Sequence, residues 1–329
     1  MGSCEYRLLS LFPGTTPHQD YPTDRPLRIP STGQVLYNGV MKIPKRLKPL
    51  VEDGLIDEVI TQLMSGKEAS VFMVRCGAKT RCAKVYKEAT NRSFKKAATY
   101  QEGRKVRNSR RARAMEKGSR YGRRQQEETW QNAELDALYK VSAVGVRVPE
   151  TYGCVNGVLL MELITDEEGY VAPRLGDVSM TPEQAIEDHG VMMQYIARML
   201  CAGIVHGDLS EFNVLVDQYG PVIIDLPQAV DASSNNNAEE MFHRDVNKIR
   251  DYYGLFAPEL LSTRYASEIW SVYSEGGLSP ETILTGRFQD DTEEADVDAV
   301  MEEIKAVYAE EQERQAYLRS LEEDQPEPY

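Results

Sequence analysis

The sequence predicts an α+β protein with two lobes, a small N-terminal lobe made mainly of strands and a C-terminal lobe made mainly of helices. Three observations support this prediction. The chain has 329 residues, 41% of them hydrophobic, which is enough for two modest cores. Short apolar runs typical of strands recur between residues 55 and 163, whereas the strongest helix start, a capping-box pattern, lies at Thr181.

The predicted first lobe begins with three strand-like segments, over residues 55–63, 71–74 and 80–86. The turn between the first two contains Ser65-Gly66-Lys67. Gly66 lets the backbone come close to a ligand, and successive N–H groups in such a turn suit phosphate oxygens. This turn is not a P-loop of the NTPase type, because Thr61 stands where that motif needs Gly.

Lys84 lies between apolar neighbours in the third predicted strand. A lone buried ammonium group is costly, so this side chain needs an anionic partner. We expect that partner to be Glu134, on a predicted helix over residues 130–138 whose apolar residues recur at helical spacing. A surface lysine and an exposed helix glutamate are the alternatives for the two residues taken separately.

A β-hairpin is expected around Asn156-Gly157, because Asn-Gly between apolar runs is the strongest short hairpin signal. Its second strand, over residues 158–163, then turns polar. We expect this strand to lead from the first lobe to the second, where its backbone groups can pair with an adenine ring. An ordinary connecting strand would have the same pattern.

The second lobe is predicted to begin with a helix that starts at Thr181, has Pro182 in its first position and ends at Gly203. A helix is also expected around residues 244–249. A further short helix is expected to start at Ser279-Pro280-Glu281.

The chemistry is concentrated between Ile204 and Asp225. Two short strands joined by a turn at residues 219–221 bring Asp208, Asn213 and Asp225 to one end of a hairpin. One carboxylate can take the proton of an incoming hydroxyl group, and two further oxygen ligands can hold Mg²⁺ on nucleotide phosphates. The pattern therefore predicts phosphoryl transfer, and the alternative is a loop in which both Asp residues cap turns.

Charge is distributed unevenly over a chain of net charge −14. Residues 92–124 contain 13 Lys and Arg against two acids, and residues 289–329 contain 15 Asp and Glu against three basic residues. We interpret the basic block as an insertion that contacts RNA or a ribosomal surface. A solvated loop is an equal alternative, because the block has few aromatic residues to stack on bases.

Cysteine and histidine usage excludes two classes of protein. The five cysteines form no C-x-x-C pair and the four histidines are scattered, so neither a disulfide framework nor a zinc site is predicted. No apolar run is long enough to cross a bilayer, and residues 1–20 lack a secretory signal. We expect a cytoplasmic protein without membrane contact.

Taken together, several motifs resemble the RIO family of atypical serine/threonine protein kinases, and within it a RIO1-related protein of bacterial type. The motifs are Ser65-Gly66-Lys67-Glu68-Ala69, Lys84, Glu134 with Trp130, Met161-Glu162-Leu163-Ile164, His206-Gly207-Asp208 with Asn213, and Ile223-Ile224-Asp225 with Pro227-Gln228. The resemblance covers about residues 50–260 and implies a bilobal protein-kinase-like fold. The predicted domains are an arm over residues 1–45, an N-lobe over 46–163 with a basic insertion at 92–124, a C-lobe over 164–288 and an acidic helical tail over 289–329.

The resemblance also implies roles for individual residues, with ATP and Mg²⁺, or Mn²⁺, as cofactors. Asp208 would deprotonate the attacking hydroxyl group, Asn213 and Asp225 would hold the metal, and Asp225 could form an aspartyl-phosphate in ATPase-like turnover. The nucleotide would be bound by Lys84 paired with Glu134, by Ser65, Gly66 and Lys67 over the phosphates, and by backbone groups of Glu162 and Ile164 at the adenine.

A second motif resembles part of a kinase site. His243-Arg244-Asp245 resembles a kinase catalytic triplet, but it follows Asp225 on a predicted helix and has no Asn five residues after Asp245, so we interpret it as structural.

The favoured activity is ATP-dependent phosphorylation of an unknown protein substrate, with the chain itself as one substrate. The alternatives are a small-molecule kinase of the aminoglycoside or choline type and a nucleotide-dependent scaffold for RNA or ribosomes.

Overall fold

The computed structural model describes residues 43–87 and 133–289. The arm up to residue 42, the basic insertion and the tail from residue 290 lie outside the described residues, so the predicted domain boundaries stay predictions. The chain divides into two compact units, residues 1–287 and 288–329. The first unit contains every helix and strand named below, and only residues 288 and 289 of the second are described, neither of them in a helix or strand.

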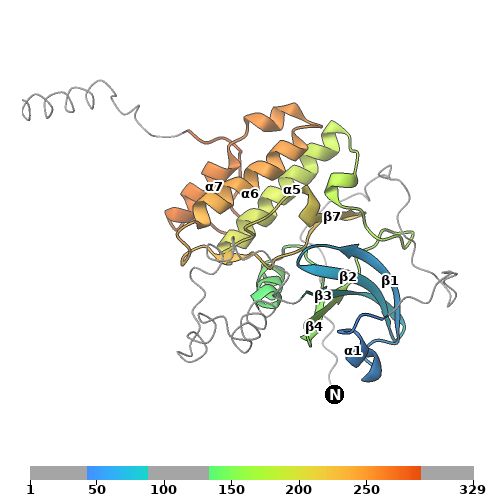
Figure 1. The fold of residues 1–329 in the computed structure, drawn as a ribbon. Helices are drawn as coiled ribbons and strands as arrows, with labels where there is room; N and C mark the ends of the chain where they lie inside the picture. Colours follow the sequence, from blue (N-terminus) through green and yellow to red (C-terminus); the bar gives the residue numbers. More distant parts are fainter. Residues whose placement is uncertain (1–42, 88–132, 290–329) are drawn as a thin grey trace, which may run out of the picture. The chain divides into compact units, whose positions relative to one another are not determined.

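The first part of the chain forms a five-stranded antiparallel sheet with the order β1-β2-β3-β5-β4 (Figure 1). A short helix, α1, packs on one face, where Leu50 belongs to the same core cluster as Phe72 and Leu160. We call this part the strand lobe. Its elements are α1 (Lys48–Glu52), β1 (Glu58–Ser65), β2 (Ala69–Cys76), β3 (Lys79–Tyr86), β4 (Thr151–Val155) and β5 (Val158–Glu162). Residues 133–143 form a helix between β3 and β4.

The alternation of side chains along β3 sorts its residues between two environments. Successive residues of a strand point to opposite faces of the sheet. Ala83 and Val85 belong to the core cluster under α1, whereas Cys82, Lys84 and Tyr86 line a cavity on the opposite face. The strand therefore presents its lysine to the cavity because its apolar neighbours fill the core.

The second part, which we call the helical lobe, is built on α5, with α6 and α7 beside it (Figure 1). Met192, Phe242 and Ile269 from these three helices share one buried core. None of the helices in residues 43–87 and 133–289 has the length and apolar character needed to cross a membrane. The elements are α5 (Pro182–Cys201), β6 (Ile204–Val205), β7 (Val214–Asp217), β8 (Gly220–Ile223), β9 (Val230–Asp231), α6 (Ala238–Tyr253) and α7 (Tyr265–Ser274), with 3-10 turns at Leu175–Asp177, Glu211–Asn213 and Pro258–Ser262.

The predicted start of α5 at Thr181 and the predicted β4–β5 turn at Asn156-Gly157 are confirmed. The Thr181 hydroxyl accepts a hydrogen bond from the Gln184 N–H (3.3 Å), and the Gln184 side chain accepts one from the Thr181 N–H (3.0 Å). Gly203 has a φ of 72°, so the chain leaves the helix through the left-handed region that glycine favours. Asn156 and Gly157 also have positive φ values, 52° and 76°, as a tight hairpin turn requires.

Three local predictions are corrected. The first strand begins at Glu58 and runs to Ser65, later than expected. The β7–β8 turn is Gln218-Tyr219, and Pro221 lies within β8 opposite Val216. The Val216 N–H points away from β8 and donates to Pro173 O (2.9 Å), so this pair has no ladder bond that the missing N–H of Pro221 would remove. The predicted helix at Ser279 is wrong, since Ser279 N–H donates to Thr282 Oγ1 (2.9 Å) in a non-helical turn.

Candidate active site

A cavity of about 1080 Å³ lies between the sheet and the β7–β8 hairpin. Its walls come from the strand lobe, from the segment after β5 and from the helical lobe. The side chains that line it include Lys84, Glu134, Asn213 and Asp225. This volume accommodates a nucleotide-sized ligand, and the cavity brings together Lys84 and Asp225, which are 141 positions apart in the sequence.

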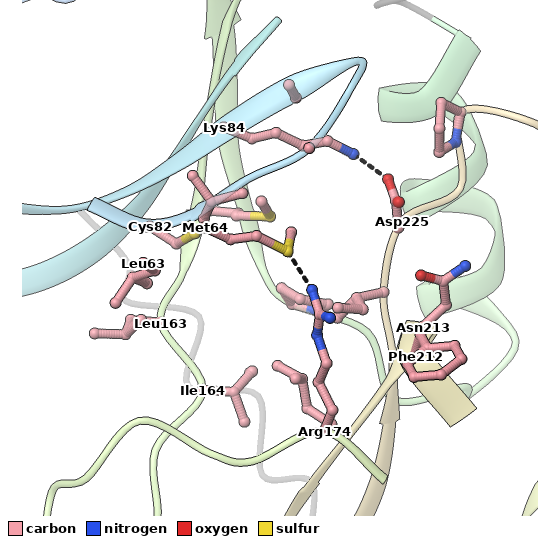
Figure 2. Close-up of a pocket in the computed structure, with 18 of the residues that line it drawn as sticks. Leu63, Met64, Cys82, Lys84, Leu163, Ile164, Arg174, Phe212, Asn213 and Asp225 are labelled. Atoms are coloured by element: carbon pink, nitrogen blue, oxygen red, sulfur yellow. Dashed lines mark hydrogen bonds and ion pairs between the residues drawn. The ribbon is translucent and has the colours of Figure 1, made fainter. Parts of the chain in front are cut away.

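Lys84 is the centre of a buried charge network. Its Nζ lies 2.6 Å from Glu134 Oε1 and also contacts Asp225 Oδ1, as Figure 2 shows for the second pair. Burial lowers the pKa of the Lys84 ammonium, but Glu134 and Asp225 outweigh that effect and raise the pKa above its usual value. The lysine therefore remains charged inside the cleft.

Tyr86 is a second donor to Glu134, which the sequence reasoning missed. Its hydroxyl donates to Glu134 Oε2, while Lys84 occupies Oε1. Burial and the nearby Glu134 carboxylate raise the pKa of Tyr86 well above its usual value. Both carboxylate oxygens of Glu134 are thus engaged, and the orientation of the carboxylate toward Lys84 is fixed.

Hydrogen bonds hold the segment from His206 to Asp225 together. Asn213 Nδ2 donates to Asp208 O (2.8 Å), and Ile224 N–H donates to Asn213 O (3.0 Å). The Asp208 N–H donates to Nδ1 of the buried His206 ring (3.3 Å). The other ring nitrogen, Nε2, lies 3.1 Å from Ile224 O. Burial lowers the pKa of His206, so a neutral ring with its proton on Nε2 satisfies both contacts.

Asp225 has an unusual backbone conformation for a residue with a side chain. Its φ is 66°, in the left-handed region. Burial raises the pKa of its carboxyl, but Lys84 outweighs this effect and the pKa lies below the usual value. The carboxylate is therefore ionised and directed toward the cavity (Figure 2).

Helix α6 holds the loop that carries Asp208. The buried Asp245 carboxylate accepts N–H groups of Gly207 (2.7 Å) and Leu209 (3.2 Å), and Arg244 donates to Gly207 O. Burial raises the pKa of Asp245 to about 7, although the two N–H donors oppose that shift. This geometry agrees with the structural interpretation of the His243-Arg244-Asp245 triplet.

Asp208 itself is not among the residues that line the cavity. Its carboxylate lies 3.4 Å from Lys248 Nζ, one turn further along α6 than Asp245. We expected Lys248 on a helix around residues 244–249 but assigned it no role. The helical spacing of Asp245 and Lys248 was a usable signal, because residues three apart on a helix share one face.

The turn between β1 and β2 covers one end of the cavity. Gly66 and Lys67 line it, and Gly66 O accepts a hydrogen bond from Lys87. Ser65 is not among the lining residues, and its hydroxyl lies 3.1 Å from Ser70 Oγ and 3.3 Å from Lys87 Nζ. Lys87 therefore ties the turn to the end of β3.

Glu162 and Ile164 line the cavity where β5 leads into the helical lobe. The Glu162 N–H donates to Glu150 O (2.8 Å), and Ile164 O accepts from Ala172 N–H (3.0 Å). Among the described residues and outside the strand ladders, no backbone bond engages the Glu162 carbonyl or the Ile164 N–H, which are one acceptor and one donor. An adenine edge offers the complementary donor and acceptor.

The donor set fits Mg²⁺. Because Asn213 Nδ2 is engaged with Asp208 O, the amide oxygen Oδ1 is left as a ligand, beside the ionised Asp225 carboxylate. Within the described ranges no group of three His, Cys, Asp or Glu side chains is arranged to hold a metal. Mg²⁺ suits such a site, because it commonly takes one or two protein oxygens and completes its shell with water and phosphate.

A sheet lobe and a helical lobe around such a cavity define a bilobal, protein-kinase-like fold, as predicted. The family model described as RIO domain matches residues 70–266. A RIO-type serine/threonine-protein kinase, Rio1, of Haloferax volcanii is 34% identical over 208 residues, which cover 62% of this chain and 66% of the relative. The human serine/threonine-protein kinase RIO1 is 29% identical, covering 70% of this chain and 39% of the relative.

The chain therefore belongs to the RIO family, and that prediction is confirmed. It spans just under two thirds of the archaeal relative and less than half of the human one. A crystal structure of the Rio2 kinase–ADP/Mg²⁺–phosphoaspartate complex from Chaetomium thermophilum aligns with a TM-score of 0.45 at 20% identity, over 70% of each chain. The two relatives are archaeal and human, and bacterial-type membership stays a prediction.

Proposed function

We propose that this protein is an ATP- and Mg²⁺-dependent atypical serine/threonine protein kinase that phosphorylates itself and a further protein substrate. The observation that carries the proposal is the contact of Lys84 with both Glu134 and Asp225 inside a nucleotide-sized cavity. Relatives with 34% and 29% identity are named serine/threonine-protein kinases, which favours a protein over a small-molecule substrate.

The nucleotide is assigned to the cavity by the chemistry of its walls. Lys84 and the backbone turn at Ser65, Gly66 and Lys67 would bind the phosphates, with Glu134 holding Lys84 in place. The Glu162 carbonyl and the Ile164 N–H would bind adenine. Asn213 and Asp225 would hold Mg²⁺, or Mn²⁺, which when bound neutralises charge on the phosphates.

Asp208 is assigned as the base for the acceptor hydroxyl. The hydroxyl oxygen attacks the terminal phosphorus, the bond to the ADP oxygen breaks, and the hydroxyl proton passes to the Asp208 carboxylate. Lys248, together with the hydrogen bonds from the Gly207 and Leu209 N–H groups to Asp245, would keep that carboxylate in position. We also assign to Asp225 a second reaction, in which its carboxylate takes the phosphoryl group, ADP leaves, and water then hydrolyses the aspartyl-phosphate.

Two further assignments complete the proposal. Contact with RNA or a ribosome through residues 92–124 stays a prediction, because that block lies outside the described residues. A cytoplasmic location without membrane contact also stays a prediction. The small-molecule kinase has no observation in its favour.

The test is incubation with γ-labelled ATP and Mg²⁺, followed by mapping of the labelled residues. Asp208→Ala is expected to lower label on Ser and Thr by roughly 10²–10⁴-fold, the usual contribution of general base catalysis. Asp251→Asn, at an exposed residue of α6, is the matched control. Label that resists acid is phosphoester, whereas label released by hydroxylamine is acyl-phosphate and should disappear in Asp225→Asn. Unchanged incorporation in Asp208→Ala would reject the assignment.

A further inference from the structure

Arg174 is fixed by its backbone to the helical lobe. It forms an isolated antiparallel bridge with Leu215 in β7. The neighbouring Pro173 O accepts the Val216 N–H (2.9 Å), and Arg174 O accepts the Asp177 N–H (2.9 Å). These bonds on both sides hold the Cα of Arg174 in place, so the direction of its side chain is set by the fold.

The Arg174 side chain extends into the cavity, and its guanidinium meets the sulfur of Met64 near the end of β1 (Figure 2). The contact joins the two lobes across the cavity. A thioether is a weak acceptor, whereas a guanidinium carries five N–H donors. Among the described residues, Met64 is the one side chain that accepts a hydrogen bond from Arg174, so the group is held by a partner that a stronger acceptor displaces.

Arg174 differs from the other cations that line the cavity. Lys84 is already paired with two carboxylates, and Lys67 is exposed in the β1–β2 turn. Arg174 is half-buried and forms no ion pair with a described carboxylate. Asn213 and Asp225 line the same cavity as Arg174, as Figure 2 shows.

We propose that Arg174 is a phosphate-binding residue of the nucleotide site, which exchanges the Met64 sulfur for phosphate oxygens when ADP or ATP enters. The proposal rests on the proposed nucleotide binding. A guanidinium forms paired hydrogen bonds to phosphate, and these are stronger than a bond to a thioether. The exchange also breaks the Met64 contact between the lobes, so nucleotide binding and release of that contact are coupled.

Calorimetric titration of the full chain with Mg²⁺-ADP and with adenosine tests this role without measuring catalysis. Arg174→Met keeps much of the side-chain bulk and removes the donors. We expect it to weaken ADP binding by about tenfold, while adenosine affinity changes by less than about twofold. Arg174→Lys keeps the positive charge but lacks the paired N–H donors of the guanidinium, so its ADP affinity should fall by less than that of Arg174→Met. Arg287→Met, at an exposed residue outside the cavity lining, is the matched control.

Met64→Leu separates phosphate binding from the contact between the lobes. It removes the sulfur and keeps Arg174, so ADP affinity is expected to stay constant or increase. Three results would overturn the proposed role of Arg174 and leave the proposed function standing. They are an ADP affinity of Arg174→Met equal to that of the wild type, equal losses of affinity for ADP and adenosine in that variant, and a loss of ADP affinity in Met64→Leu equal to that in Arg174→Met. A wild-type chain that does not bind ADP would overturn the proposed function as well. Thermal unfolding of each variant confirms that the compared proteins are folded.

Discussion

The site contains two lysine–carboxylate pairs that differ in burial. In the strand lobe, Lys84 Nζ lies 2.6 Å from Glu134, and the side chains are 8% and 2% exposed. In the helical lobe, Lys248 Nζ lies 3.4 Å from Asp208, and the side chains are 40% and 46% exposed. Removing one member of a buried pair leaves the other charge desolvated and unpaired, which is costly. In an exposed pair, water can solvate each charge, so the pair contributes little.

This difference matches the parts that we assign to the pairs. A residue that must present a fixed charge to a phosphate benefits from a buried partner. A base that must meet an incoming hydroxyl group needs to be accessible, and its lysine neighbour can restrain it without shielding it. The comparison therefore predicts that variants of the first pair disturb folding and variants of the second disturb mainly chemistry.

The largest effect on stability is expected from Glu134→Ala. Removing this carboxylate leaves the Lys84 ammonium buried with Asp225 as its remaining carboxylate partner and removes the acceptor of Tyr86. We expect a loss of about 3–5 kcal/mol in the free energy of unfolding, measured by urea denaturation. Glu187→Ala, at an exposed residue of α5, is the control. A loss below about 1 kcal/mol would show that the strand-lobe pair behaves like an exposed one.

His189 shows what burial does to a titratable group that forms no ion pair with the part of the chain that the structure describes. It is buried between the rings of Tyr253 and Tyr265, and burial, with a smaller effect of Arg250, lowers its pKa to about 4. The unfolded chain binds the proton from about pH 6.5 downward, so stability falls as the pH decreases from 6.5 to 4. We expect a loss of about 3 kcal/mol over that range, at roughly 1.4 kcal/mol per pKa unit.

The measurement is chemical denaturation at pH 7 and at pH 4.5, for the wild type and for His189→Gln. The variant does not titrate at this position, so its stability should decline less with acid than that of the wild type. Parallel declines in both proteins would mean that His189 is protonated in the folded state without cost.

The smallest effect on stability, and a clear one on chemistry, is expected from Lys248→Met. Half-exposed pairs contribute about 0–1 kcal/mol, so the free energy of unfolding should change by no more than that. The rate of label incorporation should fall by roughly 10- to 100-fold, because Asp208 loses the neighbour that restrains it, while ADP affinity stays constant. Lys140→Met, at an exposed lysine of the helix 133–143, is the control. An unchanged rate would remove Lys248 from the site.

Several features of the fold and the site could be predicted from the sequence because they depend on residues close to one another in the chain. The Asn156-Gly157 turn, the Thr181 capping box and the alternation of polar and apolar residues in β3 each depend on neighbours within a few positions. Lys84 and Glu134 were paired by a physical requirement, since a buried ammonium group needs an anion. The structure brings these two side chains together across 50 positions.

Other parts had no local signal. The partner of Arg174 is Met64, 110 positions away on a different lobe, and no periodicity links the two. Lys248 became a neighbour of Asp208 only because α6 packs under the loop, with Asp245 binding Gly207 and Leu209. The helix expected at Ser279 failed for a related reason, since Ser279 binds Thr282 within a turn instead of capping a helix.

The sequence by itself determined the strands of the strand lobe, the helix that starts at Thr181, the family and the residue types able to carry phosphoryl transfer, because these depend on spacing along the chain. The tertiary structure alone decided that Lys84 also contacts Asp225, that Lys248 contacts Asp208 and that Arg174 crosses the cavity. The physical reason is that desolvation and ion pairing depend on distances between segments remote in sequence, and those distances are set by packing of the whole unit.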